Sequence, residues 1–222
     1  MNNILNEIKT IALRFSKIKK IILFGSRARK DNTNFSDYDI AVFAEQLDDR
    51  EKESFLSEID DVNTLNKIDI IFIDKRHINT EIYKNIMKEG ITIVDKFQIK
   101  LNNYNKALLR LHEAIEEVAQ SESLTVRDGA IQRFEFTAEL AWKTMREYLI
   151  LEEVTDINSP KNVLVEAYKN KLITNDIGWL QLLRDRNSTS HIYDETDATE
   201  IYKRISTIHV ELFDELSDKL ND

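Results

Sequence analysis

The chain has 222 residues and a net charge of −9 at pH 7, with no cysteine, one proline and four glycines. Without cysteine there is neither a disulfide framework nor a thiolate zinc site, and so few Pro and Gly residues argue against long disordered linkers. No apolar run of about 18 residues and no basic leader followed by an apolar segment is present, so we expect a cytoplasmic globular protein that does not associate with membranes.

The acidic excess lies almost entirely in the second half. Residues 1–97 contain 16 Lys and Arg against 17 Asp and Glu, whereas residues 98–222 contain 15 against 23. An acidic half disfavours a broad surface that follows a nucleic-acid backbone. We therefore expect no DNA partner, although a small local basic site is compatible with this composition.

Helical and strand-like segments alternate in the first half. Amphipathic or charged stretches predict helices, and short apolar runs predict strands. In chain order these are a helix over 3–18, strands over 21–24 and 38–43, a helix over 48–63, a strand over 67–73, a helix over 77–89 and a strand over 91–94. This mixture is typical of an α/β or α+β domain, which we place at 1–97.

After residue 97 the apolar residues follow helical spacing only. The first helix is predicted from a stripe with steps of four and three, formed by Phe97, Leu101, Tyr104, Leu108, Leu111, Ile115 and Val118. A second helix is expected over 126–150. A third is expected to begin at Ser159 and Pro160, which suit a helix cap and a first helical position. A fourth is expected to begin at about 175–176. A long fifth helix follows Thr196, with a core face of Ile201, Ile205, Ile208 and Leu212.

These patterns predict an α+β protein with two domains. Domain 1–97 is expected to be a small mixed sheet with helices. Domain 98–222 is expected to be an all-α antiparallel helical bundle, because its five helices have short connections.

A Gly-Ser turn followed by two aspartates carries the clearest chemical signal. Gly25 ends a predicted strand and Ser26 begins a helix, a turn that directs free backbone N–H groups at a phosphate. Asp37 and Asp39 are two positions apart on the next strand, so both carboxylates face the same side. Asp69 lies within an apolar strand, and a buried carboxylate needs a cation or hydrogen bonds.

Three hard carboxylates beside a phosphate-binding turn fit one or two Mg²⁺ ions. One ion would bind the phosphates of a nucleoside triphosphate and the other would polarise the attacking hydroxyl, with Asp69 as general base or as a bridging ligand. Arg27 and Arg29 would neutralise the triphosphate or the departing pyrophosphate. The alternative is purely structural: an ordinary turn and an edge strand, with Asp69 paired to Lys67.

These residues resemble the minimal nucleotidyltransferases of the DNA polymerase β superfamily. The Gly-Ser turn, the ten-residue spacing to Asp37-Tyr38-Asp39 and the later strand residue Asp69 match the pattern over about 1–97. The resemblance implies ATP as the substrate and catalytic, metal-binding roles for the three aspartates. It also implies nucleotide-binding roles for Gly25, Ser26, Arg27, Arg29 and Ser36.

A second group of polar residues lies near the end of the predicted fourth helix: Arg186, His191 and Tyr193. A histidine that titrates near neutral pH and an arginine that stabilises phosphate charge could cleave RNA without a metal. Five residues correspond to about 140° around an ideal helix, so Arg186 and His191 would converge only through a bend or a second subunit. The alternative is a capped helix end with a hydrogen-bonded histidine and a core tyrosine.

The spacing Arg-x4-His-x-Tyr resembles the motif of HEPN domains, helical bundles that dimerise and place this motif at the dimer interface. Residues 132–143 (QRFEFTAELAWK) are similar to the helix signature of the HEPN branch called nucleotidyltransferase substrate-binding proteins, and the resemblance covers about 98–222. Within that signature, Phe134, Phe136 and Trp142 are expected to pack in the core, and the alternative is that they form a platform for a nucleobase. The resemblance implies a homodimer through the helical domain.

Some HEPN–nucleotidyltransferase pairs are toxin–antitoxin systems, in which the nucleotidyltransferase transfers AMP to the motif tyrosine of an RNase partner. Carried over to this sequence, the acceptor would be Tyr193, and Arg186 and His191 would be the RNase residues, with RNA as a candidate partner.

The combined pattern favours an enzyme, a Mg²⁺-dependent nucleotidyltransferase that transfers AMP from ATP to a tyrosine of its own or a partner's helical domain. One alternative is a nucleotidyltransferase that acts on a small hydroxylated molecule, as antibiotic-type enzymes do. Another is a metal-independent HEPN RNase that the first domain restrains. A non-catalytic nucleotide sensor is disfavoured, because pure binding does not need three carboxylates.

Overall fold

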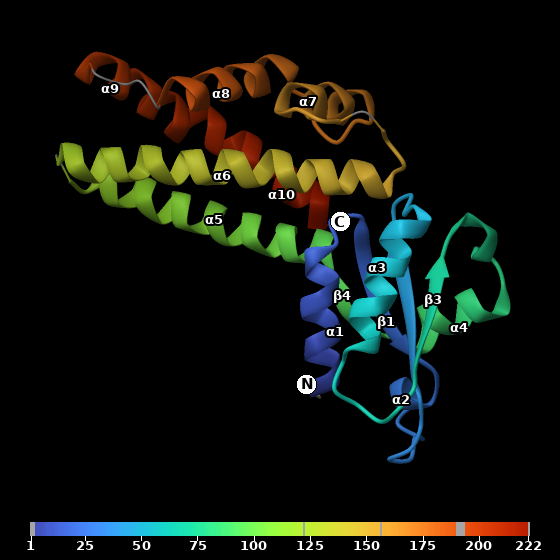
Figure 1. The fold of residues 1–222 in the computed structure, drawn as a ribbon. Helices are drawn as coiled ribbons and strands as arrows, with labels where there is room; N and C mark the ends of the chain where they lie inside the picture. Colours follow the sequence, from blue (N-terminus) through green and yellow to red (C-terminus); the bar gives the residue numbers. More distant parts are fainter. Residues whose placement is uncertain (1–2, 122, 156, 190–193, 222) are drawn as a thin grey trace. The chain divides into compact units, whose positions relative to one another are not determined.

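The computed structural model describes residues 3–121, 123–155, 157–189 and 194–221. The chain divides into two compact units, Met1–Lys96 and Phe97–Asp222 (Figure 1). None of the described helices is both long and apolar enough to cross a membrane.

The first unit is built on a four-stranded mixed sheet. Its strands are β1 (Ile18–Phe24), β2 (Tyr38–Ala44), β3 (Ile68–Ile73) and β4 (Ile91–Asp95), in the order β3-β2-β1-β4. Strand β1 is antiparallel to β2 and β4, whereas β2 and β3 are parallel. The small mixed sheet expected from the sequence is confirmed.

Four α-helices accompany this sheet: α1 (Asn3–Arg14), α2 (Gly25–Arg29), α3 (Asp49–Asp60) and α4 (Glu81–Glu89). Helix α1 ends four residues earlier than expected because Ile18 already belongs to β1, where it is fully buried and paired with Ala44. Helix α4 begins after Thr80, whose hydroxyl accepts a hydrogen bond from the Tyr83 amide, and a 3₁₀ turn (Lys75–His77) occupies part of the segment before it.

The two faces of the sheet bury different helices. Residues of α1 and α3, such as Ile8 and Phe55, pack on the face that carries Ile40 and Val42. On the opposite face, Ala41 of β2 packs with Ile86 of α4. Because side chains alternate along a strand, the odd-numbered residues of β2 lie on the α4 face.

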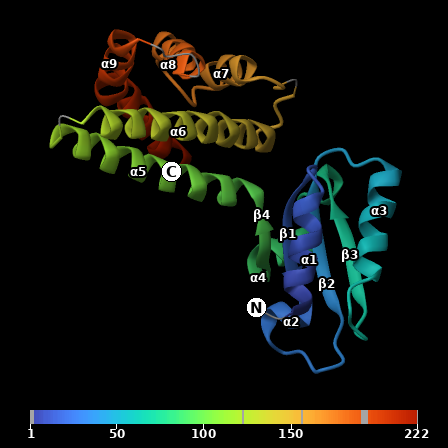
Figure 2. The same ribbon diagram turned by 60° about the vertical axis from the view of Figure 1, so that its left-hand side comes forward.

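The second unit is entirely helical. It consists of α5 (Lys96–Ala119), α6 (Leu124–Leu151), α7 (Pro160–Lys169), α8 (Asp176–Thr189), α9 (Glu195–Arg204), a π-helical turn (Ile205–His209) and α10 (Val210–Asn221). Helix α6 lies between α5 and the layer formed by α7 and α8 (Figures 1 and 2). The predicted caps are present: the Ser159 hydroxyl accepts from the Asn162 amide and Pro160 begins α7.

The core of this unit follows the predicted stripe, with Leu101, Tyr104, Leu108 and Leu111 buried. The expected core position of Ile208 is wrong, because its side chain is 44% exposed. A π turn adds a residue to the helical repeat, and His209 takes the fully buried position instead. Phe136 likewise differs from expectation: Phe134 is fully buried, but Phe136 points outward and is 54% exposed.

Candidate active site

Gly25 and Asp39 meet at the end of the sheet. Gly25 follows β1 and has a φ of +69°, a left-handed conformation that costs other residues free energy. A Cβ at this position would lie 2.1 Å from Oδ2 of Asp39. Glycine therefore allows both the turn from β1 into α2 and the close approach of the Asp39 carboxylate.

Asp39 and Asp69 are paired in register across the parallel strands β2 and β3. By strand alternation both lie on the face that carries Ala41 and Ile71, the face that packs against α4. Asp37, which is exposed, directly precedes β2 rather than belonging to it. Burial and then the negative charges of Asp69 and Asp37 raise the pKa of Asp39, so the structure does concentrate carboxylates around this residue.

Asp69 is not buried as expected, since its side chain is 44% exposed. The reason is that β3 is an edge strand of the sheet. The Lys67 ammonium lies 2.5 Å from Oδ1 of Asp69, the contact that the structural alternative specified. In the described part of the chain, no three His, Asp or Glu side chains are gathered closely enough to hold a metal ion as they stand.

Arg27 is engaged with the backbone that leads into β2. Its guanidinium donates to the Ser36 carbonyl (Nη2–O 2.6 Å) and to the Asp37 carbonyl (Nε–O 3.1 Å), and it stacks 3.8 Å from the centre of the Tyr38 ring. Asn66, just before β3, also donates to the Ser36 carbonyl, at 3.2 Å. Arg27 thus positions the Asp37 backbone in this structure, a role that sequence reasoning did not assign to it.

The remaining predicted nucleotide-binding residues lie around the same turn. The Ser26 carbonyl accepts from the Asp31 amide at 3.1 Å, closing the short helix α2. Arg29 pairs with Asp31 and Glu89 at 3.1 and 3.7 Å, and its charge opposes the rise in the Asp39 pKa. The Ser36 hydroxyl accepts from the Thr33 amide at 2.9 Å, so it stabilises the loop before Asp37.

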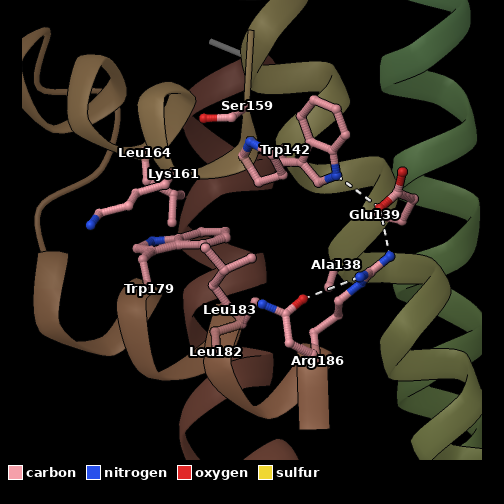
Figure 3. A pocket seen from close by; sticks show the side chains of 12 residues that line it. Ala138, Glu139, Trp142, Ser159, Lys161, Leu164, Trp179, Leu182, Leu183 and Arg186 are labelled. Atoms are coloured by element: carbon pink, nitrogen blue, oxygen red, sulfur yellow. Dashed lines mark hydrogen bonds and ion pairs between the residues drawn. The ribbon is translucent and has the colours of Figure 1, made fainter. Parts of the chain in front are cut away.

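In the helical unit, Arg186 lies on α8 and pairs with Glu139 of α6 (Nη2–Oε2 3.1 Å; Figure 3). The same carboxylate accepts from the Trp142 indole and from Lys143, both at 2.9 Å. Burial raises the pKa of Glu139, but these hydrogen bonds and the charges of Lys143 and Arg186 outweigh burial and lower it. Glu139 was not singled out from the sequence. His191 and Tyr193 lie outside the described residues.

Asp185, next to Arg186, joins α8 to the helices that follow. Its carboxylate, in a nearly buried side chain, lies 2.7 Å from His209 Nε2 and 2.7 Å from Arg204 Nε. Although burial raises the pKa of Asp185, hydrogen bonds from His209, Arg204 and Gln181 lower it to about 2. This buried network was also missed, and the only signal in the sequence is polar residues at core-facing helical positions.

Comparisons with known proteins divide the chain in the same way. Residues 6–99 match the family described as polymerase beta, nucleotidyltransferase, and residues 99–222 match the family described as nucleotidyltransferase substrate binding protein like. The probable ribonuclease HepT of Haemophilus influenzae is 30% identical over 127 residues, which span 51% of this chain and 87% of that protein.

Two solved structures are similar to about half of the chain. A Thermus thermophilus protein is 32% identical, with a TM-score of 0.50, over 54% of this chain and 99% of its own. A Haemophilus influenzae structure, described as the fold of a substrate binding domain of a nucleotidyltransferase, is 29% identical, with a TM-score of 0.51, over 55% of this chain and 99% of its own.

Proposed function

Because the chain belongs to the nucleotidyltransferase substrate-binding protein-like family and also carries a polymerase β nucleotidyltransferase domain, we propose that it is a Mg²⁺-dependent enzyme that transfers AMP from ATP to a hydroxyl group. One observation carries this proposal. Asp39 lies against Gly25 at the β1–α2 turn and opposite Asp69, and negative charge from Asp69 and Asp37 surrounds it.

The residues present suit a divalent cation. Carboxylate oxygens are the ligands that Mg²⁺ prefers, and the raised pKa of Asp39 reflects unfavourable burial and repulsion that a bound cation would relieve. Asp37, Asp39 and Asp69 would hold one or two ions once Asp69 exchanges its contact with Lys67 for the metal. When bound, Mg²⁺ supplies charge neutralisation at the phosphates and polarises the attacking hydroxyl.

The chain's own residues would perform the remaining steps. Asp69 accepts the proton of the acceptor hydroxyl, whose oxygen forms a bond to the α-phosphorus of ATP. The bond from that phosphorus to the bridging oxygen breaks, and pyrophosphate leaves with the electron pair. Arg29, beside the β1–α2 turn, would neutralise the developing negative charge in place of its contacts with Asp31 and Glu89, while Arg27 holds the backbone of Asp37 in place.

For the acceptor we propose Tyr193, in the helical half of the same chain or of a second copy in a homodimer. Support comes from the Arg186-x4-His191-x-Tyr193 spacing and from the presence of both family domains in one chain. A phenol oxygen is a competent nucleophile once its proton is removed.

The test is the intact mass of the protein before and after incubation with ATP and Mg²⁺, alongside Asp39→Asn and Tyr193→Phe. A gain of AMP units in the unmodified protein, absent from both variants, supports catalysis at the aspartates and transfer to Tyr193. A gain that persists in Tyr193→Phe would assign another acceptor. No gain, with nucleotide binding intact, would favour a small hydroxylated molecule as the acceptor.

A second candidate is metal-independent RNA cleavage by the helical half. It is favoured by the 30% identity to a probable ribonuclease and by Arg186, which a nucleolytic motif requires for phosphate charge. Cleavage of an RNA substrate in the presence of EDTA, lost in His191→Ala and retained in Asp39→Asn, would support it. Loss of both activities in either folded variant would contradict the assignment of two separate sites.

A further inference from the structure

A cavity of about 430 Å³ lies between α6, α7 and α8 in the helical unit (Figure 3). Its walls are mostly apolar: Ala138, Trp142, Leu164, Trp179, Leu182 and Leu183. The volume falls within the range of small-molecule sites, which combine apolar walls with a few placed polar groups. The chain has two tryptophans, and both line this cavity.

Polar groups line the cavity in two places: Ser159 and Lys161 at the start of α7, and Glu139, Arg186 and Asn187 of α6 and α8. The Arg186 guanidinium donates hydrogen bonds to the Glu139 carboxylate (3.1 Å; Figure 3) and to the Asn187 side-chain carbonyl (3.2 Å). A guanidinium has five N–H donors, and the others on Arg186 have no acceptor among the described residues. The side chain remains 39% exposed, so these donors are accessible to a ligand.

The charge around Arg186 is positive. Glu139 is paired with two cations, Lys143 at 2.9 Å and Arg186 at 3.1 Å. One carboxylate offsets only one of these cations, so a ligand at Arg186 meets a net positive charge. A planar, delocalised guanidinium with unsatisfied donors matches the geometry of a carboxylate or a phosphate.

We propose that this cavity binds a small aromatic anion, with its flat ring against Trp142 and Trp179 and its anionic group at Arg186. Indole faces favour stacked or edge contacts with a flat ring. Two sources share this chemistry, a nucleoside monophosphate and an aromatic carboxylic acid. The proposal concerns the helical unit alone and does not depend on nucleotide transfer by the first unit.

The experiment follows the tryptophan emission of the full-length protein during titration with AMP, phenylacetate and their uncharged counterparts adenosine and 2-phenylethanol. Because both tryptophans line the cavity, a saturable change reports occupancy there. Trp142→Phe and Trp179→Phe leave a single reporter each, and both are expected to respond. Saturation by AMP alone identifies a nucleotide site, and saturation by phenylacetate alone identifies a site for aromatic acids.

Arg186→Gln removes the proposed anion-binding group, and Arg184→Gln is its matched control. Arg184 is on the same helix but is exposed and does not line the cavity. Loss of a charge-assisted hydrogen bond predicts binding of the anionic probe about tenfold weaker in Arg186→Gln, with affinity unchanged in Arg184→Gln. If Arg186→Gln does not fold, Lys143→Gln serves instead, since it removes the second cation on Glu139.

Two outcomes would overturn the proposal. One is the absence of a saturable response to both anions. The other is equal affinity for charged and uncharged probes, which would assign an apolar cavity without anion recognition. Repeating the AMP titration in Asp39→Asn separates this site from the first unit: an unchanged affinity supports the cavity, whereas loss of the response would assign it to nucleotide bound at the aspartates.

Discussion

At the scale of single residues, Asp39 lies where its negative charge is unfavourable. Its carboxylate lies against a glycine and opposite Asp69, and burial and neighbouring carboxylates raise its pKa. An acid whose folded pKa is raised destabilises the fold once pH exceeds its ordinary pKa, and this penalty disappears at lower pH, where the group is protonated in both states. A bound cation would offset this unfavourable negative charge.

Replacement of Asp39 by asparagine is therefore expected to raise the Tm at neutral pH in the absence of divalent ions, because it removes the repelled charge while keeping the shape. Mg²⁺ is expected to raise the Tm of the unmodified protein and not that of the variant. Thermal unfolding with EDTA and with Mg²⁺ measures both. An equal rise with Mg²⁺ in the two proteins would exclude Asp39 as a ligand.

Gly25→Ala is expected to abolish nucleotide transfer and to destabilise the fold by about 1–2 kcal/mol or more. The left-handed backbone penalises any side chain, and the new Cβ would displace the Asp39 carboxylate. Gly129→Ala is the control, because a Cβ there meets nothing within 4 Å. Chemical denaturation and transfer assays compare the two variants. Nucleotide transfer at the wild-type rate by Gly25→Ala would refute the close approach of Gly25 and Asp39.

At the scale of elements, hydrogen bonds from residues just outside β2 and β3 fix where these two strands begin and so position the site. Arg27 of α2 and Asn66 before β3 both donate to the Ser36 carbonyl. They tie two loops to the strand ends that carry Asp37 and Asp69. Helical elements of the second unit are connected in a comparable way, through the buried carboxylate of Asp185.

Arg27→Gln is expected to reduce the transfer rate more than the affinity for ATP, because Arg27 positions the Asp37 backbone. Arg27→Lys should not restore the rate, since an ammonium cannot reproduce the stacked guanidinium and its several donors. Arg50→Gln, an exposed arginine on α3, is the control. Steady-state kinetics separate the two parameters, and a selective loss of ATP affinity would instead support direct contact with phosphate.

Asp185→Asn is expected to cost about 2–4 kcal/mol at neutral pH, because it breaks a buried network with His209 and Arg204. The Asp185 pKa of about 2 lies below its ordinary value, so its stabilisation is complete above about pH 4 and is lost as pH falls towards about 2. Urea unfolding across this range should show a flatter acid dependence in the variant.

The control for Asp185→Asn is Asp214→Asn. Asp214 also pairs with a histidine, His112 at 2.8 Å, but both side chains are more than 40% exposed. Such a pair is expected to contribute less than about 1 kcal/mol. Equal losses in the two variants would contradict the importance of burial.

At the scale of the whole molecule, the chain combines two units with separate cores. Apolar side chains of the helical unit form one cluster, and those of the first unit form clusters on the two faces of its sheet. The two similar solved structures each align over 99% of their own length with about half of this chain. Because 54% of this chain is more than the first unit, Met1–Lys96, both alignments include part of the helical unit.

A fragment that spans 97–222 is accordingly expected to fold alone, with a helical circular dichroism spectrum and cooperative urea unfolding. Its core already includes Tyr104, Phe134 and Phe213, all fully buried within the unit. A non-cooperative transition in the fragment, with a cooperative one in the full chain, would show that the helical core requires the first unit.

The sequence by itself determined the fold class, the element types and the family of each half. Hydrophobic period and capping residues are local signals, so Leu101 to Leu111 and Ser159–Pro160 could be interpreted without tertiary information. The positions of Gly25, Asp37, Asp39 and Asp69 as candidates also came from spacing alone, and their chemical roles remain predictions.

Only the tertiary structure decided which of these side chains are exposed and which partners they have. Asp69 is partly exposed because the strand order places β3 at an edge of the sheet. Arg27 donates its hydrogen bonds to backbone carbonyls of the loop that follows α2. Because of one π turn, His209 rather than Ile208 is buried in the core. Glu139 pairs with Arg186, which lies 47 positions later in the sequence. Strand order, helical register and long-range pairing depend on contacts between distant segments, which no local pattern encodes.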